Sequence, residues 1–337
     1  MRRLQTDAPF VHVGRAGDPD LRWLVGAPLP PEPCAYLLCN GEPTLYVSES
    51  ASLVFTRAVT GRVEMTDGDP TVALADALPG SDVVHAPRHL PHDAALRVEQ
   101  SGHDLRSTTA VADARTRKDE AEQTMLADAA QAAREGVECA REVLTADGAD
   151  APVVPGDDST PGERLRRRVA SAVADAGATP AVRVDGVFQV GSPVVIDTTA
   201  RVAGYHARMA RTLVVGGDGG AVRRAQVAAE SALRVAVGEA TPETDVDWLA
   251  DEVRAELGSF GVDAVDGVVV AGTGLARREA PLVGTDATLD PGSTLVVAPA
   301  ARVPERKEVV RVADTLVVGE EGAGARVLGR GSESSHG

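Results

Sequence analysis

Two segments of the chain are near-copies of each other, and they differ at a position where a carboxylate could do chemistry. Residues 191–216 read GSPVVIDTTARVAGYHARMARTLVVG, and residues 292–319 read GSTLVVAPAARVPERKEVVRVADTLVVG. Such a pair predicts two β-hairpins in a duplicated domain whose halves face each other across a shared sheet. Carboxylates on both hairpins could hold a metal ion between the halves. The first copy offers Asp197, but the equivalent position in the second is Ala298.

The near-copies, which contain three matching segments, and two further segments resemble the methionine aminopeptidase, Xaa-Pro peptidase (prolidase) and creatinase family. The five segments occur in the family's order and cover nearly the whole chain: residues 117–122, 194–216, 272–281, 289–300 and 309–318. The resemblance implies an α/β (α+β) fold class. It implies a pita-bread C-terminal domain with internal pseudo-two-fold duplication over residues 113–330, preceded by a small creatinase-type α/β domain over residues 1–112. Residues 331–337 are expected to form a disordered tail.

The family's metal ligands are largely missing from the matching positions. The resemblance places these ligands at five positions, which in this chain are Asp197, Arg208, Ala271, Ala298 and Ala313. Only Asp197 among them can bind a cation. The family's His-Glu-x-Pro motif is represented by Arg278, with Glu279 and Pro281 retained, and Arg278 or Arg311 is the expected partner of Glu279.

The residues left at these positions favour an ion pair over a metal site. Divalent ions that activate water need several converging carboxylate or imidazole ligands, so one carboxylate is not enough. The guanidinium of Arg208 stays charged at any relevant pH and would repel a dication. Two unit charges about 4 Å apart interact by about 4 kcal/mol at an effective dielectric constant near 20, so Arg208 should attract Asp197. We predict a vestigial pocket with no catalytic residue, metal or cofactor, formed by Asp197, Arg208, Ala271, Arg278, Glu279, Ala298, Arg311 and Ala313.

Three functions stay open at this point. The first is a degenerate Xaa-Pro-peptidase-like protein, a pseudoenzyme whose cleft binds a peptide or an acidic small molecule. The second is an enzyme, either a metal-dependent aminopeptidase or Xaa-Pro dipeptidase with other ligands, or a metal-free creatinase-like hydrolase. His206 shares a strand face with Arg208 and is the candidate base for the last of these, although lone histidines are more often structural. The third is a partner subunit, in a homodimer or paired with an active paralogue.

The composition predicts a cytoplasmic protein without nucleic-acid or membrane partners. The 337 residues carry a formal charge of −16, with 50 acidic residues against 34 basic ones. An acidic surface repels nucleic acid and anionic lipids. Only Lys118 and Lys307 are lysines, which fits a halophilic archaeon or a GC-rich bacterium. Three cysteines without metal-ligand spacing fit a reducing compartment, and the sequence shows neither a signal peptide nor a membrane-spanning run.

Periodicity and turn signals predict the following elements. Strands are expected at 21–27, 34–40, 44–50 and 83–87, and helices at 70–78, 91–101, 117–145, 162–176, 220–239 and 243–258, with a loop at 147–161. The first long helix should bury a stripe formed by Ala121, Met125, Ala129, Ala133, Val137, Ala140 and Leu144. The basic run at 164–168 is interpreted as a solvated helix face.

Three histidines in the last third of the N-terminal domain invite a metal interpretation. His85, His89 and His92 are spaced three or four residues apart, but Pro87 and Pro91 interrupt any helix through them. Carboxylates and cysteines that could complete a ligand set are scarce nearby. The prediction here is a solvated loop.

Overall fold

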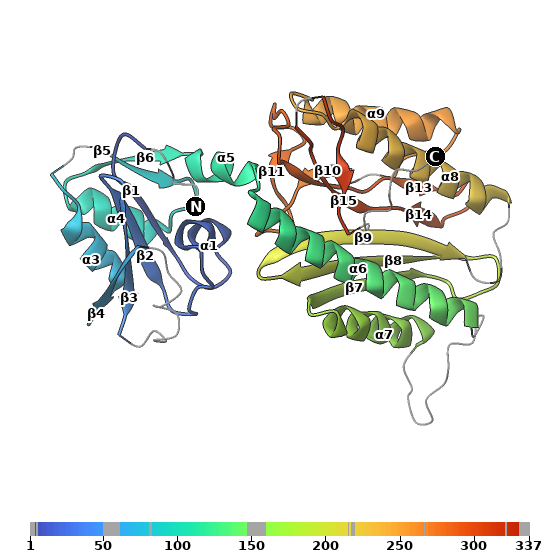
Figure 1. The fold of residues 1–337 in the computed structure, drawn as a ribbon, viewed down its shortest axis with the longest axis horizontal. Helices are drawn as coiled ribbons and strands as arrows, with labels where there is room; N and C mark the ends of the chain where they lie inside the picture. Colours follow the sequence, from blue (N-terminus) through green and yellow to red (C-terminus); the bar gives the residue numbers. More distant parts are fainter. Residues whose placement is uncertain are drawn as a thin grey trace. The chain divides into compact units, whose positions relative to one another are not determined.

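The computed structural model describes residues 4, 6–49, 61–80, 83–146, 160–214, 216, 220–265, 267, 269–320 and 322–329. The chain divides into two compact units, residues 1–115 and 116–337, which we call the N-terminal and C-terminal units (Figure 1). The tail expected at 331–337, and most of the loop expected at 147–161, lie outside the described residues. None of the described helices is both long enough and apolar enough to cross a membrane.

The N-terminal unit is built around a six-stranded sheet with the strand order β4-β3-β2-β1-β5-β6. Its strands are β1 (Phe10–Gly14), β2 (Cys34–Cys39), β3 (Glu42–Ser48), β4 (Arg62–Thr66), β5 (Val83–Pro87) and β6 (Asp104–Thr108). Its helices are α1 (Pro19–Val25), α3 (Pro70–Ala77), α4 (His92–Gln100) and α5 (Ala110–Thr116). Strand β1 pairs antiparallel with β2 and parallel with β5.

Alternation along β1 sends side chains to two separate cores. Phe10 packs with Leu21 of α1, whereas Val11 packs with Ala94 of α4. Because successive strand residues point to opposite faces, α1 and α4 cover opposite faces of the sheet. His12 follows Phe10 by two residues and therefore points to the face that α1 covers.

The predicted strand at 21–27 is wrong, because residues 21–25 belong to helix α1 and Gly26 caps it. Asp18 caps the helix, with its side chain accepting the N–H of Leu21, and Pro19 is the first helical residue. Proline is favoured there because its missing N–H would have no partner in the first turn. Gly26 ends the helix in the left-handed conformation. The apolar residues between Pro19 and Gly26 are compatible with one buried helix face as well as with a strand. The capping residues at both ends therefore favour the helix over the strand.

The C-terminal unit contains two similar halves, each with two helices and a hairpin. The first half has α6 (Glu120–Ala146), α7 (Pro161–Asp175), β7 (Thr179–Gly186), β8 (Pro193–Val202) and β9 (Tyr205–Val214). The second has α8 (Gly220–Glu239), α9 (Val246–Ser259), β10 (Val270–Gly272), β11 (Glu279–Leu282), β12 (Thr294–Val297), β13 (Ala300–Arg302), β14 (Val309–Arg311), β15 (Asp314–Val317) and β16 (Arg326–Val327). The predicted helices all occur, with ends shifted by a few residues, whereas β7 was not anticipated.

Helix α6 starts with a reciprocal cap and packs closely on α7. The N–H of Glu122 donates to Asp119 Oδ1, and the N–H of Asp119 donates to Glu122 Oε2, both at 2.9 Å. Two otherwise unpaired N–H groups are thereby satisfied. At Gly136 an added Cβ would lie 2.6 Å from Val173, so this glycine allows the two helices to approach. The predicted stripe is buried from Ala129 onward, while Ala121 is exposed and Leu126 takes over the apolar contact.

The second hairpin is interrupted where the first is continuous. Strands β8 and β9 pair without a break, but the second copy is split into the pairs β12–β15 and β13–β14. The break falls at Ala298 and Pro299, and proline cannot donate a ladder hydrogen bond. Opposite the break, Ala313 turns to the first hairpin and exchanges two 3.0 Å backbone hydrogen bonds with Ala210. We call this contact the hairpin junction.

Side chains of both hairpins reinforce the hairpin junction. Nη2 of Arg211 on β9 donates to both carboxylate oxygens of Asp314 on β15, at 2.8 and 3.0 Å. The Thr315 hydroxyl accepts the N–H of Arg208 and donates to its carbonyl oxygen. The two halves are therefore joined by groups of the protein itself.

Candidate functional site

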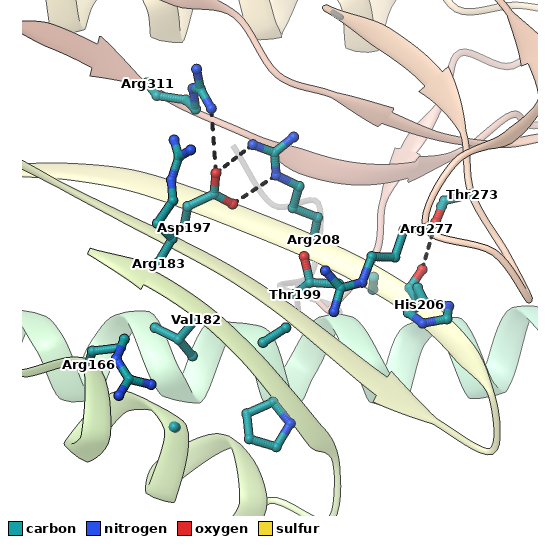
Figure 2. A pocket seen from close by; sticks show the side chains of 14 residues that line it. Arg166, Val182, Arg183, Asp197, Thr199, His206, Arg208, Thr273, Arg277 and Arg311 are labelled. Carbon is teal, nitrogen blue, oxygen red and sulfur yellow. Dashed lines mark hydrogen bonds and ion pairs between the residues drawn. The ribbon is translucent and has the colours of Figure 1, made fainter. Parts of the chain in front are cut away.

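A cavity of about 700 Å³ opens beside the first hairpin, and its lining is rich in arginine. Asp197 on β8 and Arg208 on β9 form a two-pronged ion pair in it, with distances of 2.8 Å from Nε to Oδ1 and 2.5 Å from Nη2 to Oδ2. Arg311 of β14 lies 3.5 Å from the same carboxylate. Figure 2 shows both guanidinium groups directed at Asp197. We call this space the arginine cavity.

The structure brings some of the residues named from sequence into this cavity and leaves others outside it. Asp197, Arg208 and Arg311 line it together with His206. Ala298 and Ala313 instead form a small buried apolar cluster with Ala210 and Val296. Ala271, 6% exposed, faces Val296 across the β10–β12 pair. The alanine positions therefore lie at the hairpin junction, where they are packed rather than open.

Arg278 and Glu279 differ from their expected roles. Arg278 is exposed and is not among the described residues that line the cavity, whereas its neighbour Arg277 is. Glu279 pairs with neither Arg278 nor Arg311 in any described contact, but with Lys118, whose Nζ lies 2.9 Å from its Oε1. The other carboxylate oxygen accepts the N–H of Ala276, so Glu279 holds the segment between β10 and β11.

Three arginines of the cavity were not recognised from the sequence. Arg183 lies on β7, directly across from Asp197 in the strand pairing, and the strand itself was missed. Arg166 belongs to the basic run of α7, in which Arg166, Arg167 and Arg168 are exposed as expected and Arg164 is half-buried. Arg277 comes from an irregular segment without a periodic signal. Thr199 and Thr273 add hydroxyl groups to the wall.

The cavity lowers the pKa of both Asp197 and Arg311, which favours the charged form of the aspartate and disfavours the charged form of the arginine. Burial alone would raise the pKa of Asp197, but the hydrogen bond and charge of Arg208, aided by Arg311 and Arg183, hold that pKa below its usual value. For Arg311, burial and then the charges of Arg208 and Arg183 lower the pKa, although Asp197 opposes them. The charged form of Arg311 is thus disfavoured by its surroundings, and a bound anion would relieve this.

His206 is held in one orientation at the cavity wall. Its Nδ1 lies 3.2 Å from the carbonyl oxygen of Gly274, an acceptor, so Nδ1 carries the proton and Nε2 has the lone pair. Its backbone is fixed by the same segment, because the Thr273 hydroxyl donates to the His206 carbonyl oxygen (Figure 2).

Acidification should destabilise the protein through His206. Burial lowers its pKa below the ordinary 6.5, as do the charges of Arg277 and Arg201, while the Gly274 carbonyl and Glu279 act in the opposite direction. The unfolded chain therefore takes up this proton at higher pH than the folded chain, and stability falls as pH drops below the unfolded value of 6.5. Urea midpoints measured between about pH 7.5 and about pH 5 should show a smaller loss for His206→Gln. Equal pH dependence in the variant and the parent would contradict this.

Comparison with solved structures defines the class of fold. The prolidase from Pyrococcus horikoshii OT3 is 20% identical with a TM-score of 0.80, covering 96% of this chain and 94% of that chain. The Xaa-Pro dipeptidase from Bacillus anthracis is 17% identical with a TM-score of 0.80 and coverages of 97% and 94%. Dipeptidase PepE from Mycobacterium ulcerans is 23% identical with a TM-score of 0.77 and coverages of 97% and 92%. The chain therefore has the fold of these proteins over nearly its full length.

A family model matches most of the C-terminal unit. Residues 162–320 match the model of metallopeptidase family M24, and this match together with the pita-bread fold confirms the resemblance drawn from the sequence. No curated protein matches the sequence significantly.

The residues at the expected metal positions do not fit a metal centre. Asp197 is the only carboxylate among the residues lining the cavity, and both of its oxygens are engaged by Arg208. Ala298 and Ala313 offer only methyl groups, packed against apolar neighbours. In the described part of the C-terminal unit, no three histidine, cysteine or acidic ligand atoms converge as a metal site requires. A charged arginine beside a single carboxylate is the opposite of a cation site.

Proposed function

We propose that this chain is a degenerate relative of the Xaa-Pro peptidases whose arginine cavity binds an acidic small molecule or a short acidic peptide without hydrolysing it. The observation that carries this proposal is the charge of the cavity wall. Five arginines line it against one carboxylate, Asp197, in a chain whose formal charge is −16. Arg166 and Arg183 have partners of their own, Glu163 and Asp185, but the remaining excess of positive charge favours a bound anion.

The ligand class follows from size and from hydrogen-bond geometry. About 700 Å³ lies within the range of cavities that bind small organic molecules. Guanidinium groups bind carboxylates and phosphates through paired N–H donors. Arg208 is already paired with Asp197, whereas Arg277 has no ion-pair partner among the described residues. An anion is therefore expected between Arg277 and Arg311, with the hydroxyl of Thr199 as a further donor.

Calorimetric titration and thermal unfolding in low salt test this proposal. Citrate and a Glu-Glu dipeptide should bind and stabilise the protein, a Lys-Lys dipeptide should not, and added salt should weaken binding through screening. Arg277→Ala should reduce citrate affinity about tenfold, which is about 1.4 kcal/mol. Arg254→Ala is the matched control, because Arg254 is a surface arginine of α9 paired with Asp251. Equal loss in both variants, or no citrate binding, would overturn the proposal.

The absence of hydrolysis is tested separately. With excess Mn²⁺, Co²⁺ or Zn²⁺, the protein should not cleave Xaa-Pro or Met-Ala peptides, and any metal that it retains should be unaffected by Asp197→Ala. Cleavage that disappears with Asp197→Ala, together with loss of bound metal, would favour a metallopeptidase instead.

A further inference from the structure

Three potential metal ligands converge in the N-terminal unit, at a place unrelated to the arginine cavity. His12 of β1, Asp18 before α1 and His89 after β5 each offer one ligand atom, and these atoms all lie within 4.8 Å of one another. This is the only such group among the described residues. From these residues we propose a binding site for a divalent transition-metal ion of the kind that imidazole binds well, such as Zn²⁺ or Co²⁺.

The topology of the sheet explains why the three residues meet. Strands β1 and β5 are parallel neighbours, so the segments that follow them leave from the same edge of the sheet. Helices α1 and α4, which come next, cover opposite faces. A crevice forms where neighbouring parallel strands send their connections to opposite faces, and ligands in open α/β sheets bind there. Asp18 and His89 lie in those two connections.

The geometry of the His12–Asp18 pair matches two ligands of one ion. His12 Nε2 lies 3.0 Å from Asp18 Oδ2. Two ligand atoms about 2.1 Å from an ion are about 3.0 Å apart at a right angle and about 3.4 Å apart in a tetrahedron. The other carboxylate oxygen, Oδ1, accepts the N–H of Leu21 at 2.8 Å, which fixes the carboxylate with Oδ2 facing the histidine. Metal-binding carboxylates are commonly held in this way.

His12 forms the buried side of the site. Its side chain is 0% exposed, and Nε2 is the ring nitrogen that faces Asp18 Oδ2. The other ring nitrogen, Nδ1, has no hydrogen-bond partner among the described residues and points away from Asp18, so an ion bound to Nε2 would not contact it. The proposal therefore depends on the convergence of His12 Nε2, Asp18 and His89.

His89 completes the ligand set from the solvent side. Its ring stands edge-on to that of His12, with centroids 5.1 Å apart, and its side chain is 56% exposed. Asp20 Oδ2 lies 3.5 Å from His89 Nε2 and is itself paired with Arg115. A carboxylate behind a histidine is the usual outer partner of a metal ligand. Exposure on this side leaves room for water ligands on the ion.

Gly14 leaves the space that the site needs. A Cβ at this position would lie 2.5 Å from Asp18 Oδ2, so any larger residue would push the carboxylate away from His12. Gly14→Ala should therefore weaken metal binding although it removes no ligand. Of the three histidines expected in a solvated loop, His89 lies in an exposed turn, whereas His85 belongs to β5 and His92 begins α4. The proposed partners of His89 come from another part of the chain.

Titration of the full chain with Zn²⁺ and Co²⁺, after removal of metal by a chelator, tests the site. One equivalent of Co²⁺ should give visible absorption bands, and Zn²⁺ should displace them. His89→Ala and Asp18→Asn should each weaken Zn²⁺ binding at least about tenfold. Both changes leave the fold intact, since His89 is exposed and asparagine caps a helix as well as aspartate does. Gly14→Ala should give a smaller loss.

Two matched variants separate this site from other sources of binding. His92→Ala removes an exposed histidine of α4 nearby, and Asp197→Asn removes the carboxylate of the arginine cavity. Neither should change Zn²⁺ affinity by more than about twofold. A chain that binds no Zn²⁺ saturably, or whose binding survives His89→Ala unchanged, would overturn the proposal. Because citrate binding is measured without metal, failure of this site and failure of the proposed function are independent results.

Discussion

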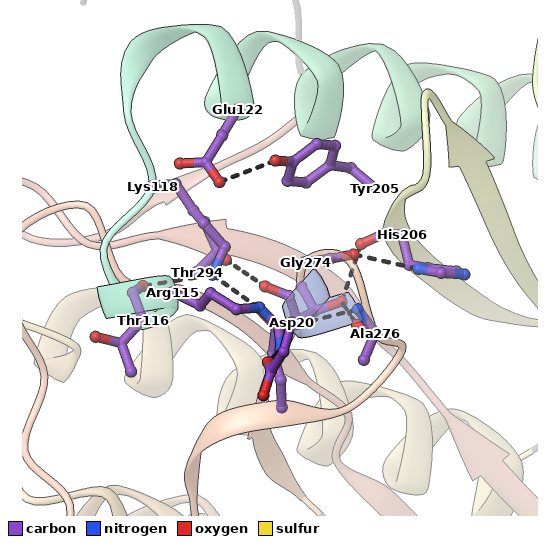
Figure 3. Close-up of polar contacts among 12 residues, drawn as sticks. Asp20, Arg115, Thr116, Lys118, Glu122, Tyr205, His206, Gly274, Ala276 and Thr294 are labelled. Atoms are coloured by element: carbon purple, nitrogen blue, oxygen red, sulfur yellow. Dashed lines mark hydrogen bonds and ion pairs between the residues drawn. The ribbon is translucent and has the colours of Figure 1, made fainter. Parts of the chain in front are cut away.

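Replacing Lys118 with alanine is expected to destabilise the C-terminal unit by about 3 to 5 kcal/mol, because it leaves a buried carboxylate without its counter-charge. The side chains of Lys118 and Glu279 are 2% and 8% exposed, and their charged atoms are 2.9 Å apart. Figure 3 shows Lys118 directed into the unit from the start of α6, beside the hydrogen bond from Tyr205 to Glu122. Urea unfolding followed through the transition of the C-terminal unit measures the effect.

The control for this prediction is an ion pair on the protein surface, where both charges are exposed to water. Arg254 and Asp251 have side chains that are 39% and 77% exposed, and exposed pairs contribute about 1 kcal/mol or less. Arg254→Ala should therefore shift the midpoint little. The double change Lys118→Met with Glu279→Leu should recover part of the loss, since no charge is then left buried. A shift for Lys118→Ala no larger than that of the control would contradict a buried pair.

Removing Asp197 should have the second-largest effect on stability, and it should exceed the effect of removing Arg208. In Asp197→Ala, Arg208 loses both of its hydrogen bonds to the carboxylate and Arg311 loses its ion pair, while Arg183 keeps its own partner Asp185. We expect a cost of about 2 to 3 kcal/mol in low salt. Arg208→Ala should cost about 1 kcal/mol or less, because Arg311 still lies 3.5 Å from the carboxylate and the cavity admits water. The sequence alone, with no second partner in view, would favour a costly Arg208→Ala.

A double-mutant cycle measured by thermal unfolding decides between these expectations. The double change of Asp197 and Arg208 to alanine should cost less than the sum of the single changes, since the two residues contact each other. Sulfate or citrate should restore much of the stability of Asp197→Ala, because an anion takes the place of the carboxylate. If Arg208→Ala destabilises the protein more than Asp197→Ala, or if anions do not restore the stability of Asp197→Ala, then Asp197 is not the group that neutralises the arginine charge of the cavity.

Local and repetitive features of the chain were predictable from the sequence. The near-copies around Asp197 and Ala298 identify the two hairpins, since their apolar alternation repeats. Long helices such as α6 follow from periodicity over many turns. The pairing of Asp197 with Arg208 also follows, because the family's hairpin register brings these positions together.

The remaining features depend on contacts between distant parts of the chain, which no local pattern encodes. Lys118 is 161 positions from Glu279, and only the fold reveals that the two side chains meet. Arg183 joins the cavity because β7 pairs with β8, and a strand with mixed apolar and charged residues gives a weak signal. His89 seemed isolated because its partner His12 lies on a strand that is adjacent only in the sheet.

The hairpin junction has a consequence for how the protein matures. Where a bound ion links two halves of a domain, the newly made chain must obtain that ion before the domain is stable. Here Ala210, Ala313 and the Arg211–Asp314 pair link the two halves, so under the function proposed above the C-terminal unit would need no loading step after synthesis. Its abundance in the cell should then stay constant when metal becomes scarce.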